Sequence, residues 1–131
     1  MGICLGLQLL FQSSEESPGV TGLGLLEGEI VRIPEAPGLK IPHMGWNSLE
    51  YRKDAKLFQG LAPEPYVYFV HSYYLKAKQE EDVAATTIYS TKIHASVEHG
   101  NLFACQFHPE KSSHTGLTIL KNFVELKGRE D

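Results

Sequence analysis

The sequence is poor in several features that define whole classes of protein. It has two cysteines, too few for a disulfide framework, and this favours a reducing cytosol. Lys and Arg total 12 against 16 Asp and Glu, and no basic stripe stands out, so nucleic-acid binding is not expected as the main function. No apolar run is long enough to span a membrane, and the N-terminus lacks the pattern of a signal peptide. We therefore expect a cytoplasmic protein without membrane segments.

Metal-binding patterns are missing as well. The histidines show no H-x-x-x-H spacing, and there is no C-x-x-C pair, so no metal site is expected. The sequence predicts surface or turn positions for four of the histidines, which are His43, His94, His99 and His114. Cys105 is expected to pack as a small buried residue rather than to act as a nucleophile, because free cysteine usually behaves as a small hydrophobe.

What is present fits one globular domain over residues 1–131, of which 42% is hydrophobic. Helices are expected at 6–14 and 113–127, with Leu117, Leu120 and Val124 as the apolar stripe of the second and Phe123 alongside. Residues 66–75 read as one strand buried on both faces. The remaining expectations are strands at 29–33, 83–89, 93–98 and 102–107, a turn and strand at 43–49, a loop at 34–42 and a helical turn at 56–61. This order predicts an α/β fold, a mixed sheet with helices packed on it.

The first residues form a G-x-C-x-G pentapeptide, Gly2-Ile3-Cys4-Leu5-Gly6, followed by an apolar run. Glycines on both sides relieve crowding around a nucleophile on a sharp strand-to-helix turn. A helix N-terminus beside the sulfur favours the thiolate. Gln8 lies four residues after Cys4 and so shares its helical face. Alone, the pentapeptide also fits an ordinary buried cysteine.

A second pattern ends the last expected strand, at Gln106-Phe107-His108-Pro109-Glu110. Residues two apart in extended chain point to the same side, so Glu110 can reach the imidazole of His108. A cysteine, a histidine that takes its proton and a carboxylate that orients the imidazole make a nucleophilic triad. Taken alone, this pattern is more simply interpreted as a histidine in a turn, His108, followed by a solvated surface charge, Glu110. Together with Cys4 on an elbow, the triad is favoured.

With G-x-C-x-G upstream and H-P-E far downstream, the sequence resembles the class I glutamine amidotransferases. Within them, four stretches resemble the glutaminase subunits of imidazole glycerol phosphate synthase: residues 2–11, 40–47, 68–74 and 106–112. The resemblance covers the chain from Met1 to about Val124. It implies a flavodoxin-like mixed sheet with flanking helices, and no cofactor.

The family's domain has several strands and a glycine-rich loop ahead of the elbow. Here only Met1, Gly2 and Ile3 precede the cysteine. An elbow is normally the joint inside a strand–helix unit, so we expect an N-terminally incomplete domain, with a strand supplied by another chain as the alternative. This expectation puts in question whether the chain folds and works alone.

The resemblance also implies roles for individual residues. Cys4 would attack the side-chain amide of glutamine, His108 would move the proton, and Glu110 would orient His108. The Leu5 N–H would stabilise the oxyanion, with a second donor from the glycine-rich loop. Four further residues match family positions that hold glutamine: Gln8 and Glu16, and the backbone at Ser72 and Tyr73.

In the family the ammonia passes to a partner, a cyclase subunit with a (β/α)₈ barrel, in a heterodimer of histidine biosynthesis. The resemblance places five residues toward this partner or the ammonia passage: Met44, Trp46, Asn47, Tyr68 and Lys111. For Met44 and Trp46, simple core packing is an equal alternative. Two other interpretations of the chain stay open: a glutaminase for a different synthase, and a catalytically silent chain that only binds a partner.

Overall fold

The computed structural model describes residues 1–16, 19 and 21–129. Two α-helices, α1 (Leu5–Leu9) and α2 (Ser113–Arg129), and three short 3₁₀ turns, η1 (Lys56–Phe58), η2 (Glu80–Asp82) and η3 (Pro109–Lys111), accompany ten strands. The strands are β1 (Gly2–Ile3), β2 (Ser13–Ser14), β3 (Gly28–Arg32), β4 (His43–Ser48), β5 (Glu50–Tyr51), β6 (Tyr66–His71), β7 (Tyr73–Ala77), β8 (Val83–Tyr89), β9 (Thr91–His99) and β10 (Leu102–Cys105).

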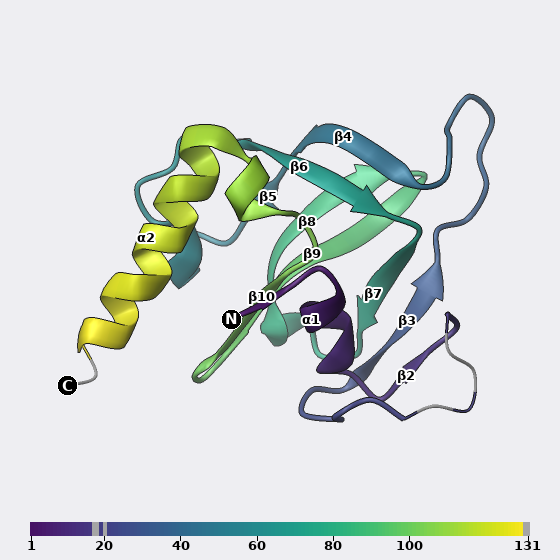
Figure 1. Cartoon of the computed structure of the whole chain (residues 1–131), viewed down its shortest axis with the longest axis horizontal. Helices are drawn as coiled ribbons and strands as arrows, with labels where there is room; N and C mark the ends of the chain where they lie inside the picture. The colour runs from purple at the N-terminus through teal and green to yellow at the C-terminus, as the bar shows by residue number, and fades with distance from the viewer. Residues whose placement is uncertain (17–18, 20, 130–131) are drawn as a thin grey trace.

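The larger sheet has eight strands in the order β1-β10-β9-β7-β3-β2, and β8 joins through β9 and carries β5. β1 runs parallel to β10 and β2 parallel to β3, whereas β10–β9, β9–β8 and β7–β3 are antiparallel. The sheet curls because β9 pairs along its length with β10 and β8 and touches β7 through His94 (Figure 1). The predicted α/β mixed sheet is confirmed.

The second sheet pairs β4 with β6 and corrects one prediction. The expected single strand 66–75 is two strands, β6 and β7, which bend apart at Ser72 and enter different sheets. Burial in β6 alternates, with Val67 and Phe69 inside and Tyr66 outside, so β6 is not buried on both faces as predicted. Alternation is typical of a strand with one solvent-facing side.

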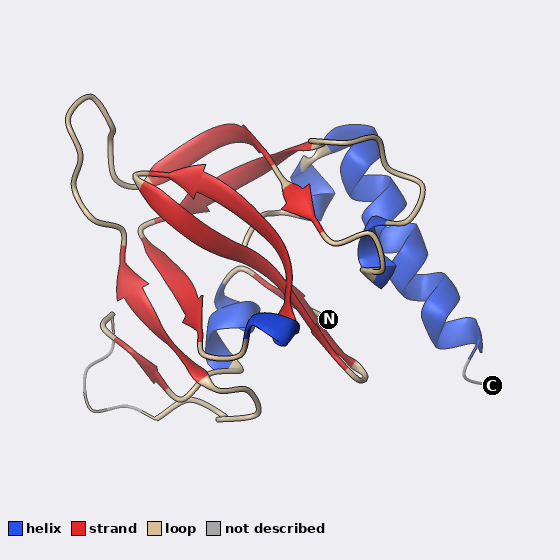
Figure 2. Ribbon diagram, turned by 180° about the vertical axis from the view of Figure 1, so that it is seen from behind, coloured by secondary structure: helices blue, strands red, loops and turns tan. Residues whose placement is uncertain are grey.

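Helix α2 lies at one flank of the sheet (Figure 2). Its predicted apolar stripe is wrong at two of its three residues, because Leu117 and Val124 are 62% and 65% exposed, whereas Leu120 is half-buried. Ile119 is fully buried instead, and Phe123 packs on the core. The buried face is rotated because Gly116 touches Pro109, where an added Cβ would lie 1.8 Å from the Pro109 carbonyl oxygen. This contact fixes how closely α2 approaches η3.

Candidate active site

The joint between β1 and α1 has the geometry of a nucleophile elbow. Cys4 adopts φ 53° and ψ −106°, a conformation that non-glycine residues rarely take and that often marks a functional site. The Cys4 N–H donates to the Cys105 carbonyl at 2.8 Å, which continues the β1–β10 ladder up to the turn. The residues ahead of the cysteine therefore form a two-residue strand within this chain.

The two glycines of the pentapeptide differ in what they do. A Cβ on Gly2 would lie 2.8 Å from the carbonyl carbon of Gly6, so glycine is needed where β1 passes α1. Apart from its chain neighbours and the backbone of its own helix, no described heavy atom lies within 4 Å of a Cβ added at Gly6. The structure therefore supports the predicted relief of crowding at Gly2 and shows no such need at Gly6.

His108 and Glu110 meet as the sequence predicts. The His108 Nδ1 lies 2.6 Å from Glu110 Oε1, and because a carboxylate only accepts, Nδ1 carries the proton. Nε2 is then left to accept, which is the state that a general base requires. The described residues show no hydrogen bond between Cys4 and His108.

The turn that carries His108 is held from three sides. The His108 N–H donates to the Tyr68 carbonyl at 2.9 Å, which ties the turn to β6. The Ser112 hydroxyl donates to the His108 carbonyl at 2.6 Å and accepts from the Tyr68 N–H at 3.0 Å. Pro109 at the start of η3 fixes the backbone between His108 and Glu110. The imidazole is therefore positioned by β6 and η3 together.

A pocket of about 320 Å³ opens beside the nucleophile. It unites Cys4 with Leu5, the expected oxyanion donor, and with all four residues expected to hold glutamine, although these come from three separate parts of the chain. The lining residues are Cys4, Leu5, Gln8, Glu16, Val70, His71, Ser72 and Tyr73. The Gln8 amide points across this space and donates to the Tyr73 carbonyl at 3.4 Å. The pocket is thus bounded by α1 on one side and by the bend between β6 and β7 on the other.

Sequence reasoning assigned no role to Gln106, which contacts the nucleophile directly. Its side chain is fully buried, its Nε2–H donates to Cys4 Sγ at 3.4 Å, and its Oε1 accepts from Gln8 Nε2 at 3.1 Å. The missed signal was position: Gln106 is two residues before His108 and directly follows β10, the strand that pairs with β1. Gln106 therefore links the nucleophile to the pocket wall.

The predicted preference for a thiolate is not borne out in this state. Burial raises the pKa of the Cys4 thiol above its ordinary value, and the Leu5 N–H and Gln106 amide, which lower the pKa, do not offset this. The carboxylates of Glu110 and Glu16 raise the pKa further. The resting nucleophile is thus a thiol that must lose its proton to a base before it attacks.

We predict that Gln106→Met raises the thiol pKa and slows alkylation of Cys4 at neutral pH by about tenfold, because a hydrogen bond to a charged group is lost. The measurement is the rate of iodoacetamide labelling against pH. Gln59→Met is the matched control, since the Gln59 amide donates to Lys53 and Ala55 carbonyls elsewhere. An unchanged labelling profile in Gln106→Met would contradict the assigned contact.

Two histidines that line or adjoin the pocket are buried, and for His43 this corrects the predicted surface position. His43 and His71 are 3% and 6% exposed and lie 3.1 Å apart, from His43 Nδ1 to His71 Nε2. Burial lowers the pKa of each to about 4, and the neighbouring His71 adds to the shift at His43. Both imidazoles are therefore neutral at pH 7.

These pKa values predict a loss of stability in acid. Between pH 6.5 and 4 the unfolded chain protonates His43 and His71 while the folded chain does not, so the free energy of unfolding falls by up to about 3 kcal/mol for each. Urea unfolding at several pH values measures this. His43→Phe should flatten the slope and His114→Gln, at an exposed position, should not. Equal slopes in all three proteins would refute the prediction.

The positions of the other histidines and of Cys105 agree with the sequence predictions except at His94. His94 is a partly buried strand residue that accepts the Ala77 N–H at 3.0 Å, so its surface assignment is also wrong. His99 and His114 are exposed, as predicted. Cys105 is fully buried, which confirms its packing role, and burial raises the pKa of its thiol. Within the described ranges no cluster of potential metal ligands and no helix suited to spanning a membrane occurs.

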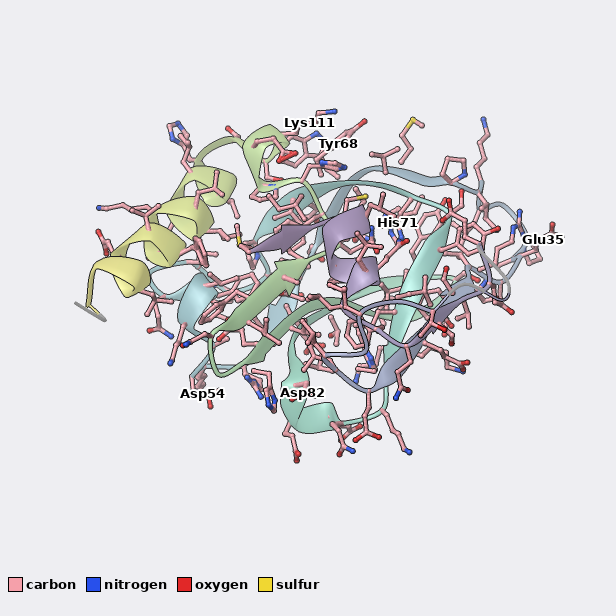
Figure 3. All side chains as sticks on the ribbon, turned by 60° about the horizontal axis from the view of Figure 1, so that its bottom comes forward. Glu35, Asp54, Tyr68, His71, Asp82 and Lys111 are labelled. Atoms are coloured by element: carbon pink, nitrogen blue, oxygen red, sulfur yellow. The ribbon has the colours of Figure 1, made fainter. Side chains whose placement is uncertain are left out.

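The residues expected at the partner lie mostly on one surface. Met44 and Trp46 on β4 are 63% and 53% exposed, which excludes core packing within this chain. Trp46 meets Tyr68 of β6 edge to face, with ring centroids 6.0 Å apart. Tyr68 and exposed Lys111 lie at the same edge of the molecule (Figure 3), where η3 contacts β6. The Asn47 amide instead points toward β8, where it donates to the Ile88 carbonyl at 2.9 Å.

Comparison with known proteins agrees with this geometry. The family model for the class-I glutamine amidotransferases matches residues 1–126. The imidazole glycerol phosphate synthase subunit HisH of Moorella thermoacetica is 53% identical over 126 residues, covering 96% of this chain and 59% of that protein. For HisH of Methanothermobacter thermautotrophicus the identity is 52%, over 96% of this chain and 62% of the relative. The chain thus spans about six tenths of the length of these relatives.

Solved structures share the fold. A putative GMP synthase component from Thermoplasma acidophilum superposes with a TM-score of 0.67 at 22% identity, over 98% of this chain and 58% of that one. A structure described as a glutamine amidotransferase gives a TM-score of 0.66 at 25% identity, over 97% of this chain and 59% of that one. The family model covers nearly the whole chain, and the relatives and the shared fold agree with it. The chain therefore belongs to the class-I glutamine amidotransferase family.

Proposed function

We propose that this chain hydrolyses glutamine to glutamate and ammonia, with Cys4, His108 and Glu110 as its triad. The observation that carries the proposal is the pocket at the elbow, which places Cys4 against Gln8, Glu16 and the Ser72–Tyr73 backbone. Glutamine has one amide to attack and a charged amino-acid end to hold. The pocket offers a nucleophile, the polar side chains of Gln8 and Glu16 and the Ser72–Tyr73 backbone, together with apolar surface from Leu5 and Val70.

In the proposed mechanism His108 Nε2 takes the thiol proton of Cys4, and the sulfur attacks the amide carbon of glutamine. The oxyanion that forms is stabilised by the Leu5 N–H, which follows the nucleophile at the start of α1. His108 then passes the proton to the leaving ammonia, and Glu110 stabilises the imidazolium through Nδ1. Water hydrolyses the glutamyl thioester and releases glutamate.

The described residues show no hydrogen bond between His108 and Cys4. In the proposed mechanism the His108 imidazole must therefore move to within hydrogen-bonding distance of the Cys4 sulfur. Catalytic hydrogen bonds in ligand-free enzymes are often long and tighten when substrate binds. The raised pKa of the Cys4 thiol fits this order of events. The sulfur stays protonated in the free chain and loses its proton to His108 once glutamine has filled the pocket. We propose that residues 1–131 belong to one amidotransferase domain.

The synthase that receives the ammonia is proposed from the relatives, which are named as subunits of imidazole glycerol phosphate synthase. In this proposal the ammonia enters a (β/α)₈-barrel cyclase that is bound as the other half of a heterodimer. The cyclase combines it with a phosphoribulosyl-formimino aminoimidazole carboxamide ribotide. The products are imidazole glycerol phosphate and an aminoimidazole carboxamide ribotide, in cytoplasmic histidine biosynthesis.

The proposed docking surface is the outer face of the β4–β6 sheet. It carries exposed Met44 and Trp46 of β4, which lie opposite half-buried Val70 and Tyr68 of β6, and exposed Tyr66 farther along β6. Exposed aromatic and Met side chains are the residues that protein interfaces favour. The surface also adjoins the triad, because the Tyr68 carbonyl accepts the His108 N–H. A cyclase bound there, with Lys111 at its rim, would receive ammonia close to where it forms.

We expect Trp46→Ala to weaken binding of the cyclase by about 30-fold or more, since a truncated aromatic anchor typically costs about 2 kcal/mol or more. Isothermal titration of the two subunits measures this. Val124→Ala, another exposed apolar residue, in the C-terminal half of α2, is the matched control. Binding that stays unchanged in a folded Trp46→Ala protein would refute Trp46 as the anchor.

The proposed reaction is tested by labelling with a chloroketone analogue of glutamine, in the presence of the cyclase. We expect one equivalent to attach to Cys4 and none to Cys105, and we expect free glutamine to protect Cys4. Peptide mass spectrometry identifies the labelled residue. Labelling that glutamine does not slow would show that the pocket does not bind glutamine, and so would contradict the proposal.

A further inference from the structure

His43 and His71 form a buried hydrogen-bonded pair that the triad does not use. His43 comes from the start of β4 and His71 from the end of β6, opposite each other in register. The pair is part of a line of four contacts that runs from Asn47 to Gln8. Asn47 Nδ2 meets His43 Nε2 at 3.5 Å, His43 Nδ1 meets His71 Nε2 at 3.1 Å, and His71 Nδ1 meets the Tyr73 carbonyl at 2.8 Å. The Tyr73 carbonyl also accepts the Gln8 amide at 3.4 Å.

The partners of this line fix the proton on each ring. A carbonyl oxygen only accepts, so His71 Nδ1 must carry hydrogen, and His71 Nε2 of the neutral ring must then accept. His43 Nδ1 is therefore the donor to it, and His43 Nε2 accepts from the Asn47 amide. The amide direction is fixed as well, because Asn47 Nδ2 also donates to the Ile88 carbonyl and Oδ1 accepts the Ser48 N–H. Both imidazoles are thereby held as the Nδ1–H tautomer.

The rings have little freedom to leave this arrangement. His43 stacks between Tyr89, with centroids 3.9 Å apart, and Phe69, with centroids 4.7 Å apart. Both histidines are nearly inaccessible to water, which removes the usual competing partner. A rotation of either ring would leave a buried donor or acceptor unpaired. The direction of the hydrogen bonds is thus enforced from the Asn47 end to the Tyr73 end.

The end of the line belongs to the candidate active site. His71 itself lines the pocket, beside α1 in Figure 3, and is followed by Ser72 and Tyr73. The bend at Ser72 separates β6 from β7, and the Ser72 carbonyl accepts the Ile33 N–H at 2.9 Å, next to the β3–β7 ladder. The contact from His71 Nδ1 to the carbonyl two residues later closes this bend from within. Gln8, which shares that carbonyl, leads on to Gln106 and Cys4.

We propose that His43 and His71 are positioning residues, locked as neutral Nδ1–H tautomers, which hold the Ser72–Tyr73 backbone in the shape that receives the amino-acid end of glutamine. The inference deepens the proposed glutaminase function and rests on it for the identity of the ligand. The histidines exchange no proton with substrate in this arrangement. They act through the Tyr73 carbonyl and through the backbone between it and His71.

The first test reads the tautomers and requires no activity. Two-dimensional ¹⁵N–¹H correlation of the imidazole rings at pH 7 separates Nδ1–H from Nε2–H forms, and His43→Phe and His71→Phe assign the signals. We expect both rings to be Nδ1–H and neutral. An Nε2–H or doubly protonated form of either ring would overturn the inference, whatever the chain's activity.

The second test uses steady-state kinetics with glutamine, on the chain in complex with its cyclase. His71→Phe keeps a ring in the cavity but removes the donor to the Tyr73 carbonyl, and we expect an about tenfold higher KM for glutamine with kcat changed by less than about twofold. His71→Asn, whose amide overlays Nδ1, should restore KM to within about threefold of wild type. A merely structural role would not give this rescue.

His94→Phe is the matched control, because it also removes an imidazole that hydrogen-bonds a backbone group, at a site lined by other residues. We expect its KM to be unchanged. An unchanged KM in a folded His71→Phe protein, or equal KM values for His71→Phe and His71→Asn, would overturn the positioning role. Absence of glutamine hydrolysis in the wild-type complex would refute the proposed function instead, and the tautomer experiment would then still decide the state of the histidines.

Discussion

Replacing Cys4 with alanine is expected to abolish glutamine hydrolysis, with kcat lowered on the order of 10⁴-fold or more. The reason is that Cys4 is the group that would form the covalent bond, and the elbow presents its sulfur to the pocket through a backbone conformation with φ 53°. The assay is glutamate formation by the chain in complex with its cyclase. Because alanine is smaller than cysteine, the elbow and its contact with β10 should be kept, and the folded protein should still bind the cyclase.

Cys105→Ala is the control for this experiment. Its thiol is fully buried one strand away, and burial raises its pKa, so it cannot supply a thiolate at neutral pH. We expect most of the activity to remain, with a loss of stability of about 1 kcal/mol from the small cavity. The reverse pattern, an active Cys4→Ala and an inactive folded Cys105→Ala, would refute the assignment of the nucleophile.

The second large effect is expected at His108. His108→Ala removes the proposed base for a thiol whose pKa is already raised, so kcat should fall on the order of 10³-fold or more at neutral pH. Since the missing base can be replaced in part by hydroxide, the residual activity should rise with pH. The measurement is kcat from pH 6 to 10 for the variant and the wild type.

His114→Ala provides the comparison, because His114 is an exposed histidine six residues away in sequence, on α2. Its pH profile should match that of the wild type. A His108→Ala protein that retains wild-type kcat, or one whose residual activity is independent of pH, would show that another group takes the proton.

The parts of the site that sequence could predict are those fixed by short-range chemistry. Cys4 on its elbow and the contact between His108 and Glu110 follow from spacing along a few residues. The gathering of Gln8, Glu16 and the Ser72–Tyr73 backbone at one pocket needed the family resemblance as well, since no local pattern joins α1 to the bend after β6.

The errors have a common cause, which is tertiary packing. Residues 66–75 form a continuous apolar run, yet the chain bends at Ser72 because β6 pairs with β4 and β7 with β3. The stripe on α2 was displaced because Gly116 lets the helix turn a different face to Pro109. Periodicity shows that a segment is amphipathic, but neighbours decide which of two similar faces is buried.

His43 was missed for a related reason. Its burial depends on Phe69 and Tyr89, which are distant in sequence, and its pairing with His71 depends on the register of β4 against β6. Gln106 shows the same limit, because its contact with Cys4 exists only where β10 meets β1. A single sequence carries no signal for contacts of this kind, and these residues emerge only from the assembled sheet.

The most direct test of the account is ammonia release from glutamine in the presence of the cyclase together with its ribotide. It would be run on this chain and on its Cys4→Ala variant, each in complex with the cyclase. We predict that the complex with Cys4 releases ammonia and that the complex with the Cys4→Ala variant releases none, although both are folded and assembled. A folded complex that contains Cys4 yet releases no ammonia would contradict the glutaminase function, and equal release by the variant would contradict Cys4 as its nucleophile.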